Sequence, residues 1–82
     1  MSSAKIETTQ GLCVIALTKH LMKKFELAED TAYAKLIDME LYLLLMDSDT
    51  GLYLETNHYL CEACDIELNN GKDALYEYIN KE

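Results

Sequence analysis

The sequence predicts an all-α protein, a compact single-domain bundle of four to five short helices with one short extended segment near residues 52–55. Three observations lead to this prediction. The 82 residues suit one domain, and 50% of them are apolar, which is enough to build a core. There is no proline and there are only three glycines, so residues that break helices are scarce. A β-sandwich or barrel needs turn residues roughly every 8–12 positions, and the chain lacks them.

The beginning of the chain is predicted to contain a disordered tail, residues 1–8, followed by a single helical domain, residues 9–82. Thr8 or Thr9 suits the N-cap of a first helix that ends near Phe25. Its residues 12–16 are apolar on nearly all sides, so we expect other helices to cover them. The residues expected on its buried side are Val14, Leu17, Leu21 and Phe25, with Ile15 and Met22 beside them.

The middle of the chain is predicted to hold a second helix over residues 28–38 and a buried element over residues 39–47. Residues 41–46 are all apolar, which places this element at the centre of the fold. A turn over residues 48–51 follows. The residues expected on the buried side of the second helix are Ala32, Tyr33, Leu36 and Ile37.

Two further helices complete the predicted bundle. The first begins at Thr56 or Asn57, where either side chain can cap it, and extends to about Asn69. Asn70 and Gly71 then end it with a left-handed residue, as glycine often does. The last helix covers residues 72–80, and its expected inward residues are Leu75, Tyr76 and Ile79.

Charge and hydropathy exclude several classes of function. The formal net charge is −8 and there is no arginine, which argues against direct nucleic-acid binding because phosphates need clustered cations. The charge is uneven, with +3 over residues 1–25 and −11 over residues 26–82. The longest apolar run has six residues, far short of the ~20 needed to cross a membrane, and no signal peptide is apparent. We therefore expect a cytoplasmic protein whose three cysteines are reduced thiols.

Asp47 and Asp49 form a DxD pair directly after the apolar run, as in some phosphatases and metal sites. In dehalogenase-type phosphatases Gly-Thr follows the pair, whereas here the order is Thr-Gly. An EF-hand loop beginning at Asp47 would place Leu52 where glycine is required and His58 where a glutamate is required. The pair is therefore interpreted as part of a turn that Gly51 closes.

The motif His58-x-x-Cys61-x-x-Cys64 has the residue types of a zinc site. On a helix, however, the two cysteines share an apolar face with leucines, and His58 lies on another face with Glu62 and Asp65. We therefore expect no metal and no cofactor, and we interpret the cysteines as core residues.

No catalytic arrangement is apparent in the sequence. There are only two histidines and three serines, no nucleophile elbow and no glycine-rich phosphate loop. We therefore expect a protein that is not an enzyme.

A surface is the more promising candidate. The chain has six tyrosines, and tyrosine is favoured at protein interfaces. Acidic residues accompany several of them, which suits a partner with a basic surface. That these tyrosines complete the core instead is an equally weighted alternative, and a homodimer is also compatible with so small a domain. The candidate partner-binding residues are Asp47, Asp49, Tyr53, Glu55, Tyr59, Glu62, Asp65 and Ile66.

The order of motifs resembles a family of small bacterial proteins catalogued as a domain of unknown function. The resemblance rests on Tyr33-x-x-Leu36, on Tyr59-Leu60, and on the step Gly71-Lys72-Asp73 before a last amphipathic helix. Where that family carries Leu-His-Thr-Gln-Gly, this chain has Leu-Asn-Asn-Gly over residues 68–71. Members are often encoded beside an ADP-ribosyltransferase-like protein, in pairs similar to toxin and antitoxin. The resemblance implies a protein that neutralises or regulates an encoded partner.

The sequence therefore predicts a small acidic protein that acts by protein–protein binding, in the manner of an antitoxin or immunity protein. Two alternatives stay open. One is an acidic mimic of nucleic acid that inhibits a basic enzyme. The other is a small zinc- or thiol-dependent protein that uses His58, Cys61 and Cys64.

Overall fold

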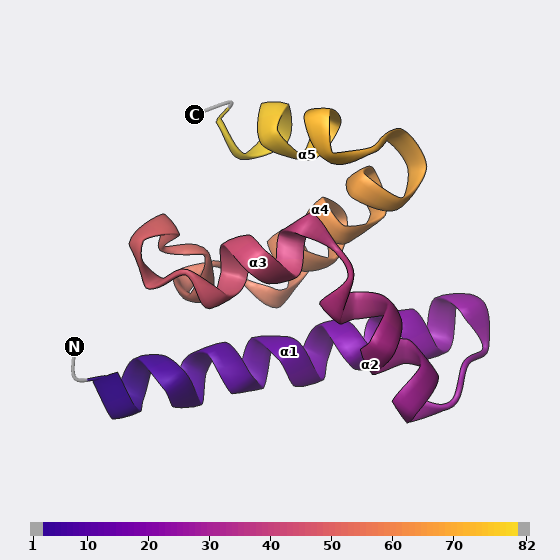
Figure 1. The fold of residues 1–82 in the computed structure, drawn as a ribbon, viewed down its shortest axis with the longest axis horizontal. Helices are drawn as coiled ribbons and strands as arrows, with labels where there is room; N and C mark the ends of the chain where they lie inside the picture. Colours follow the sequence, from indigo (N-terminus) through magenta and orange to yellow (C-terminus); the bar gives the residue numbers. More distant parts are fainter. Residues whose placement is uncertain (1–2, 81–82) are drawn as a thin grey trace.

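The structure is a computed structural model that describes residues 3–80, and over these residues it contains five α-helices, two short 3-10 turns and no strand (Figure 1). The all-α prediction is confirmed. The α-helices are α1 (Ser3–Phe25), α2 (Glu29–Ile37), α3 (Glu40–Met46), α4 (Asn57–Asn70) and α5 (Lys72–Ile79). The 3-10 turns are η1 (Ser48–Thr50) and η2 (Leu52–Leu54). No helix in this part of the chain is long and apolar enough to cross a membrane.

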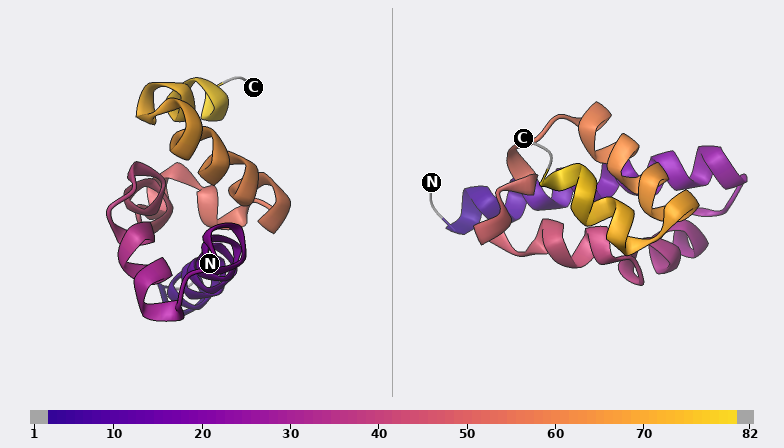
Figure 2. Two further views of the ribbon diagram at one scale, coloured as in Figure 1. Left: turned by 90° about the vertical axis from the view of Figure 1, so that its right-hand side faces the viewer. Right: turned by 90° about the horizontal axis from the view of Figure 1, so that it is seen from above.

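The helices are arranged in three tiers in the view of Figure 1. α1 forms one side of the molecule, and α2 folds back against its carboxyl-terminal half. α3 and α4 lie above α1, with both 3-10 turns beside α3. α5 packs on α4 at the far side from α1 (Figure 2). α1 therefore packs against α2, α3, α4 and η2.

The core lies between these tiers and consists mainly of leucine. Fully burying a leucine side chain contributes roughly 1.5–3 kcal/mol, so these few residues account for much of the stability of the bundle. Every α-helix contributes at least one buried residue. The largest fully buried side chains are Leu17, Leu21, Leu36, Leu41, Leu45, Leu60, Leu75 and Cys64.

α1 begins at Ser3, six residues earlier than expected, so residues 3–8 of the predicted disordered tail are helical. The predicted N-cap is wrong for the same reason. The Thr8 and Thr9 hydroxyls donate to the carbonyls of Ala4 and Lys5, one turn earlier in the same helix. Threonine often forms this bond inside a helix, so its presence in the sequence does not by itself indicate an N-cap. Residues 1–2 and 81–82 lie outside the described residues.

The buried side of α1 is rotated relative to the prediction. Leu17 and Leu21 are fully buried as expected, whereas Phe25 is exposed. Leu12 is 62% exposed and Ile15 is 52% exposed, so the expectation that other helices cover residues 12–16 is wrong. The neighbours of α1 pack on one side of it only, and no described helix reaches its outer face.

α2, α3 and α5 each present one face to the core, and the predictions for their other faces need correction. Tyr33 and Ile37 are exposed on α2, although both were expected inside. Leu43 on α3 is 60% exposed, so this element is not buried on all sides. Tyr76 on α5 is also exposed, and its hydroxyl donates to the Glu40 carboxylate. A helix of seven to nine residues has only about two turns. With so few positions, the spacing of its apolar residues does not reveal which face is covered.

The segment after α3 forms two 3-10 turns, and the short extended piece predicted near residues 52–55 is a turn over Leu52–Leu54. Gly51 joins the two turns at a φ of 71°, in the left-handed region that glycine adopts without steric cost. Thr56 caps α4, because its hydroxyl accepts a hydrogen bond from the Tyr59 N–H at 3.1 Å. Gly71 ends α4 with a φ of 90° and a ψ of 176°, which is not the left-handed conformation expected.

α3 is held at both ends by side chains from other helices. At its start, the Glu67 carboxylate of α4 accepts from the N–H groups of Glu40 and Leu41 at 2.8 and 2.9 Å. At its end, the buried Gln10 amide of α1 donates to the carbonyls of Leu45 and Met46 at 3.2 and 3.1 Å. Helix ends expose backbone groups that need partners, so these contacts fix α3 between α1 and α4.

Candidate functional site

The two aspartates of the DxD pair lie in an exposed turn. Asp47 is the N-cap of η1, and its carboxylate accepts a hydrogen bond from the Asp49 N–H at 3.0 Å. The Thr50 hydroxyl donates to the carbonyls of Leu44 and Asp47. One carboxylate of the pair therefore stabilises the turn, and both remain accessible to a partner.

His58, Cys61 and Cys64 do not converge. His58 is exposed and lies 3.3 Å from a Glu62 carboxylate oxygen, whereas Cys64 is fully buried and Cys61 is half-buried. Burial raises the pKa of Cys64 to about 12, and the negative charge of Asp65 adds to this effect. Burial likewise raises the pKa of Cys61. Among residues 3–80, no three histidine, cysteine or carboxylate side chains are grouped so that they could hold a metal ion.

A tyrosine–carboxylate cluster joins α4 to α5. The rings of Tyr59 and Tyr78 lie 5.1 Å apart between centroids, at an interplanar angle of 36°. The Tyr78 hydroxyl donates to the Glu62 carboxylate at 2.9 Å. Burial, followed by this bond and the charges of Glu62 and Glu55, raises the pKa of Tyr78 to about 12. The tyrosine thus remains a protonated donor within an electronegative environment. Tyr78 was not among the predicted residues, because no local pattern links α5 to α4.

Asp65 faces α1. Its carboxylate lies 2.8 Å from His20 Nε2 and 3.5 Å from Lys24 Nζ, so it ties α4 to the carboxyl-terminal half of α1. The sequence separates His20 from Asp65 by 45 positions, and no pattern indicated this contact. Asp65 is therefore engaged within the bundle.

The remaining predicted residues border two hollows. Tyr53 and Glu55 line one of about 530 Å³ against α1, together with Leu12 and Lys19. Ile66 lines a second of about 680 Å³ between α4 and α5, where Glu77 and Tyr78 also contribute. The structure thus joins Tyr59 and Glu62 through Tyr78. The other predicted residues lie in separate surroundings, with Asp65 against α1 and Asp47 and Asp49 in the exposed turn.

Charge divides the chain into two unequal halves. Residues 1–38 contain five lysines and five carboxylates and are neutral overall, so the whole net charge of −8 belongs to residues 39–82. Between Lys35 and Lys72 there is no cationic lysine or arginine, but there are eight carboxylates. This lysine-free segment includes all eight predicted surface residues. Its uncompensated charge favours a cationic partner.

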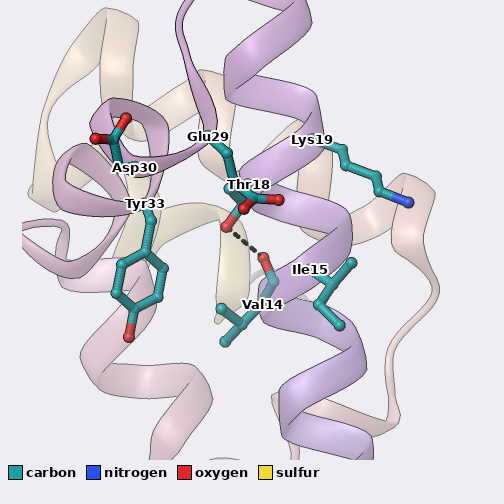
Figure 3. A pocket seen from close by; sticks show the side chains of 7 residues that line it. All are labelled: Val14, Ile15, Thr18, Lys19, Glu29, Asp30 and Tyr33. Atoms are coloured by element: carbon teal, nitrogen blue, oxygen red, sulfur yellow. Dashed lines mark hydrogen bonds between the residues drawn. The ribbon is translucent and has the colours of Figure 1, made fainter.

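A groove of about 350 Å³ between α1 and α2 was not predicted (Figure 3). Its exposed apolar residues, Ile15 and Tyr33, were both expected inside, so no sequence pattern indicated a surface here. Thr18 in its wall donates to the Val14 carbonyl at 2.7 Å, so its hydroxyl is satisfied within α1. The lining residues are Val14, Ile15, Thr18, Lys19, Glu29, Asp30 and Tyr33.

Comparison with known proteins gives no match to a family model, a curated protein or a solved structure.

Proposed function

We propose that this protein binds a partner with a basic surface, and neutralises or regulates it without catalysing a reaction. Binding uses the lysine-free acidic segment between Lys35 and Lys72, together with the cluster that Tyr59 and Glu62 of this segment form with Tyr78 of α5. This is the role of an antitoxin- or immunity-like protein.

The observation that carries the proposal is the concentration of the entire net charge in residues 39–82. Most carboxylates there have no lysine in the same segment to neutralise them, so a cationic surface gains attraction at contact and is steered during approach. The adjoining Tyr59 and Tyr78 rings add apolar area and a face for a lysine or arginine side chain. Tyr78 holds the Glu62 carboxylate in place, which lowers the entropy lost on binding.

The test is co-expression of the tagged chain with the product of the adjacent gene, followed by measurement of the dissociation constant of any complex. Reversing two charges of the acidic segment, Glu55→Lys with Glu62→Lys, is expected to weaken binding by at least about 100-fold, given the several kcal/mol at stake in interfacial charge pairs. The matched control reverses two exposed charges outside the segment, Glu7→Lys with Glu26→Lys. It is expected to change the constant by less than about threefold.

Absence of a complex, or equal effects of the two double variants, would contradict the proposal. Salt provides a second readout. The dissociation constant is expected to rise between low and high NaCl, because exposed charges are screened within ~8 Å at physiological ionic strength.

A nucleic-acid mimic makes the same salt prediction, so the two are separated by competition. If added DNA or RNA displaces the chain from the partner, the acidic surface occupies the partner's nucleic-acid groove. If neither displaces the chain, it binds outside such a groove, as the proposed function requires.

A further inference from the structure

We propose that two copies of this chain pair through the groove between α1 and α2, so that α1 of each copy lies over α2 of the other. The proposal concerns the neutral half of the molecule. It is therefore independent of the partner-binding function assigned to the acidic half.

The groove has an apolar part that a second copy can cover. Ile15 is 52% exposed on its α1 edge and Tyr33 is 43% exposed on its α2 edge. In Figure 3 these two side chains lie on opposite sides of the groove at similar height, with Val14 between them. A branched aliphatic side chain and an aromatic ring pack well against each other when both are removed from water.

The same groove has a charged part, one helical turn farther along. Lys19 projects from the α1 edge, and Asp30 from the α2 edge, again on opposite sides in Figure 3, with Glu29 near the middle. Because α2 folds back along α1, the apolar pair and the charged pair lie at two successive levels along the groove. Ile15 is level with Tyr33, and Lys19 is level with Asp30.

This arrangement is self-complementary. In a two-fold symmetric dimer, a residue on one side of the axis faces the residue of the other copy that lies on the opposite side. An axis directed along the groove therefore places Ile15 against the second copy's ring at position 33, and Lys19 against its carboxylate at position 30. Both contacts occur twice, and each pairs unlike charges or apolar groups.

Charge favours a second copy over the basic partner at this face. A basic partner would meet Lys19 on the α1 edge as well as the carboxylates of α2. A second copy instead places a side chain of opposite charge against Lys19 and against Asp30. Lys19 and Asp30 balance each other in the groove lining, and Glu29 leaves each face with a single negative charge, far less than the −8 of the whole chain. The −8 of each copy lies in residues 39–82.

The test uses charge reversal in separate chains. Lys19→Glu alone places like charges opposite each other in a homodimer, and Asp30→Lys alone does the same with positive charges. Each variant is expected to dimerise at least about tenfold more weakly than the wild type in sedimentation velocity over a concentration series. An equimolar mixture is expected to form a heterodimer with wild-type affinity, since both contacts then pair opposite charges.

This restoration by mixing requires contact between two chains, so no effect within one monomer can produce it. Ile15→Ser is expected to abolish dimerisation. Leu43→Ser, which changes an equally exposed residue on α3, is expected to leave it unchanged. Circular dichroism and the melting temperature of dilute samples check that every variant is folded.

Three outcomes would overturn the proposal. The wild type could sediment as a 9.4 kDa monomer up to millimolar concentration. A dimer could form that neither charge reversal weakens, which would place the interface elsewhere. Finally, the mixture of the two variants could fail to associate more tightly than either variant alone.

Discussion

The buried polar side chains all have hydrogen-bond partners in the part of the chain that the structure describes. Gln10 and Thr18 are the buried polar residues, and each donates to a backbone carbonyl. The two bonds differ in reach, because Thr18 bonds within α1 whereas Gln10 bonds across to α3. A bond between helices specifies how they pack, so Gln10 is the more informative residue to change.

Replacing Gln10 with alanine is expected to lower the free energy of unfolding by about 1–3 kcal/mol, because two carbonyls at the end of α3 lose their donor inside the protein. Urea denaturation measures this change. Thr9→Ala is the control, since that hydroxyl bonds only within its own helix, and a loss below about 0.5 kcal/mol is expected. Similar losses for the two variants would contradict the role assigned to Gln10.

Cys64 makes stability depend on pH in the alkaline range. Burial raises its pKa from 9.0 to about 12 in the folded chain. Above pH 9 the unfolded chain therefore releases a proton that the folded chain keeps, and stability decreases as the pH rises towards about 12. The slope contributed by this single thiol approaches about 1.4 kcal/mol per pH unit.

Comparing wild type with Cys64→Ala by urea denaturation between pH 8 and about 11 tests this expectation. The variant is expected to lose stability more slowly as the pH rises, whatever its stability at pH 7. Parallel curves would show that Cys64 titrates in the folded chain as it does in the unfolded one.

At the scale of elements, α3 depends on its neighbours. It has seven residues, too few to be stable alone, and its N-cap residue Met39 makes no side-chain hydrogen bond. Glu67 of α4 replaces that cap by accepting two backbone N–H bonds, and a carboxylate also interacts favourably with the positive end of a helix.

Glu67→Ala is expected to destabilise the fold by about 1–3 kcal/mol, since two N–H groups at the start of α3 lose a charged acceptor. Glu67→Gln, which keeps one acceptor oxygen, is expected to lose less. Thermal and urea denaturation provide the measurement, with Glu77→Ala on the exposed side of α5 as the matched control. If removing Glu77 costs as much as removing Glu67, the cap is not what stabilises α3.

The link between α1 and α2 contains a strained residue. Glu26 follows the end of α1 with a φ of 54°, and the next N–H, that of Leu27, donates to the Met22 carbonyl at 3.0 Å. This is a Schellman-type helix end, where glycine is the usual residue because a side chain at positive φ is unfavourable.

Glu26→Gly is therefore expected to raise the free energy of unfolding by about 0.5–1 kcal/mol, an unusual gain from introducing glycine. Lys23→Gly, inside α1, is expected to lower it by a similar amount. Calorimetry of both variants tests the assignment, and a decrease for the two alike would contradict it.

The whole molecule combines a neutral half, α1 and α2, with an acidic half that carries all of the net charge. Repulsion among like charges in a compact structure opposes folding. The charge of the acidic half thus lowers the stability of the fold but creates a surface that attracts cations. The neutral half is free to pack against a copy of itself.

Adding NaCl is therefore expected to raise the melting temperature by a few degrees between about 10 and 300 mM, because it screens the carboxylates from one another. Asp49→Asn with Glu55→Gln is expected to melt higher at low salt and to gain less from NaCl. Lys72→Gln, which removes a cation, is expected to do the reverse. A melting temperature that falls with NaCl would contradict this account.

Two kinds of information in the sequence, its apolar pattern and its capping and turn residues, were sufficient to predict the fold class and the order of most elements. The absence of proline and the apolar periodicity predicted the helices, and Thr56 and Gly71 marked the start and end of α4 correctly. The turn at Asp47–Gly51 was also recognised, because Asp, Thr and Gly act there through neighbouring backbone atoms. These features depend on residues within a few positions of each other.

The sequence by itself determined the helical fold class, the approximate position of most helices, the turn after α3 and the charge of each segment, since these depend mainly on local properties. Only the tertiary structure decided which apolar residues are covered. Ile15 and Tyr33 are of the same residue types, at the same helical spacing, as residues that are buried. They are exposed because no described helix packs over them. The same holds for the pairing of His20 with Asp65 and for the caps that Gln10 and Glu67 supply to α3. Each joins residues 26 to 45 positions apart, and packing between helices, rather than local preference, brings them together.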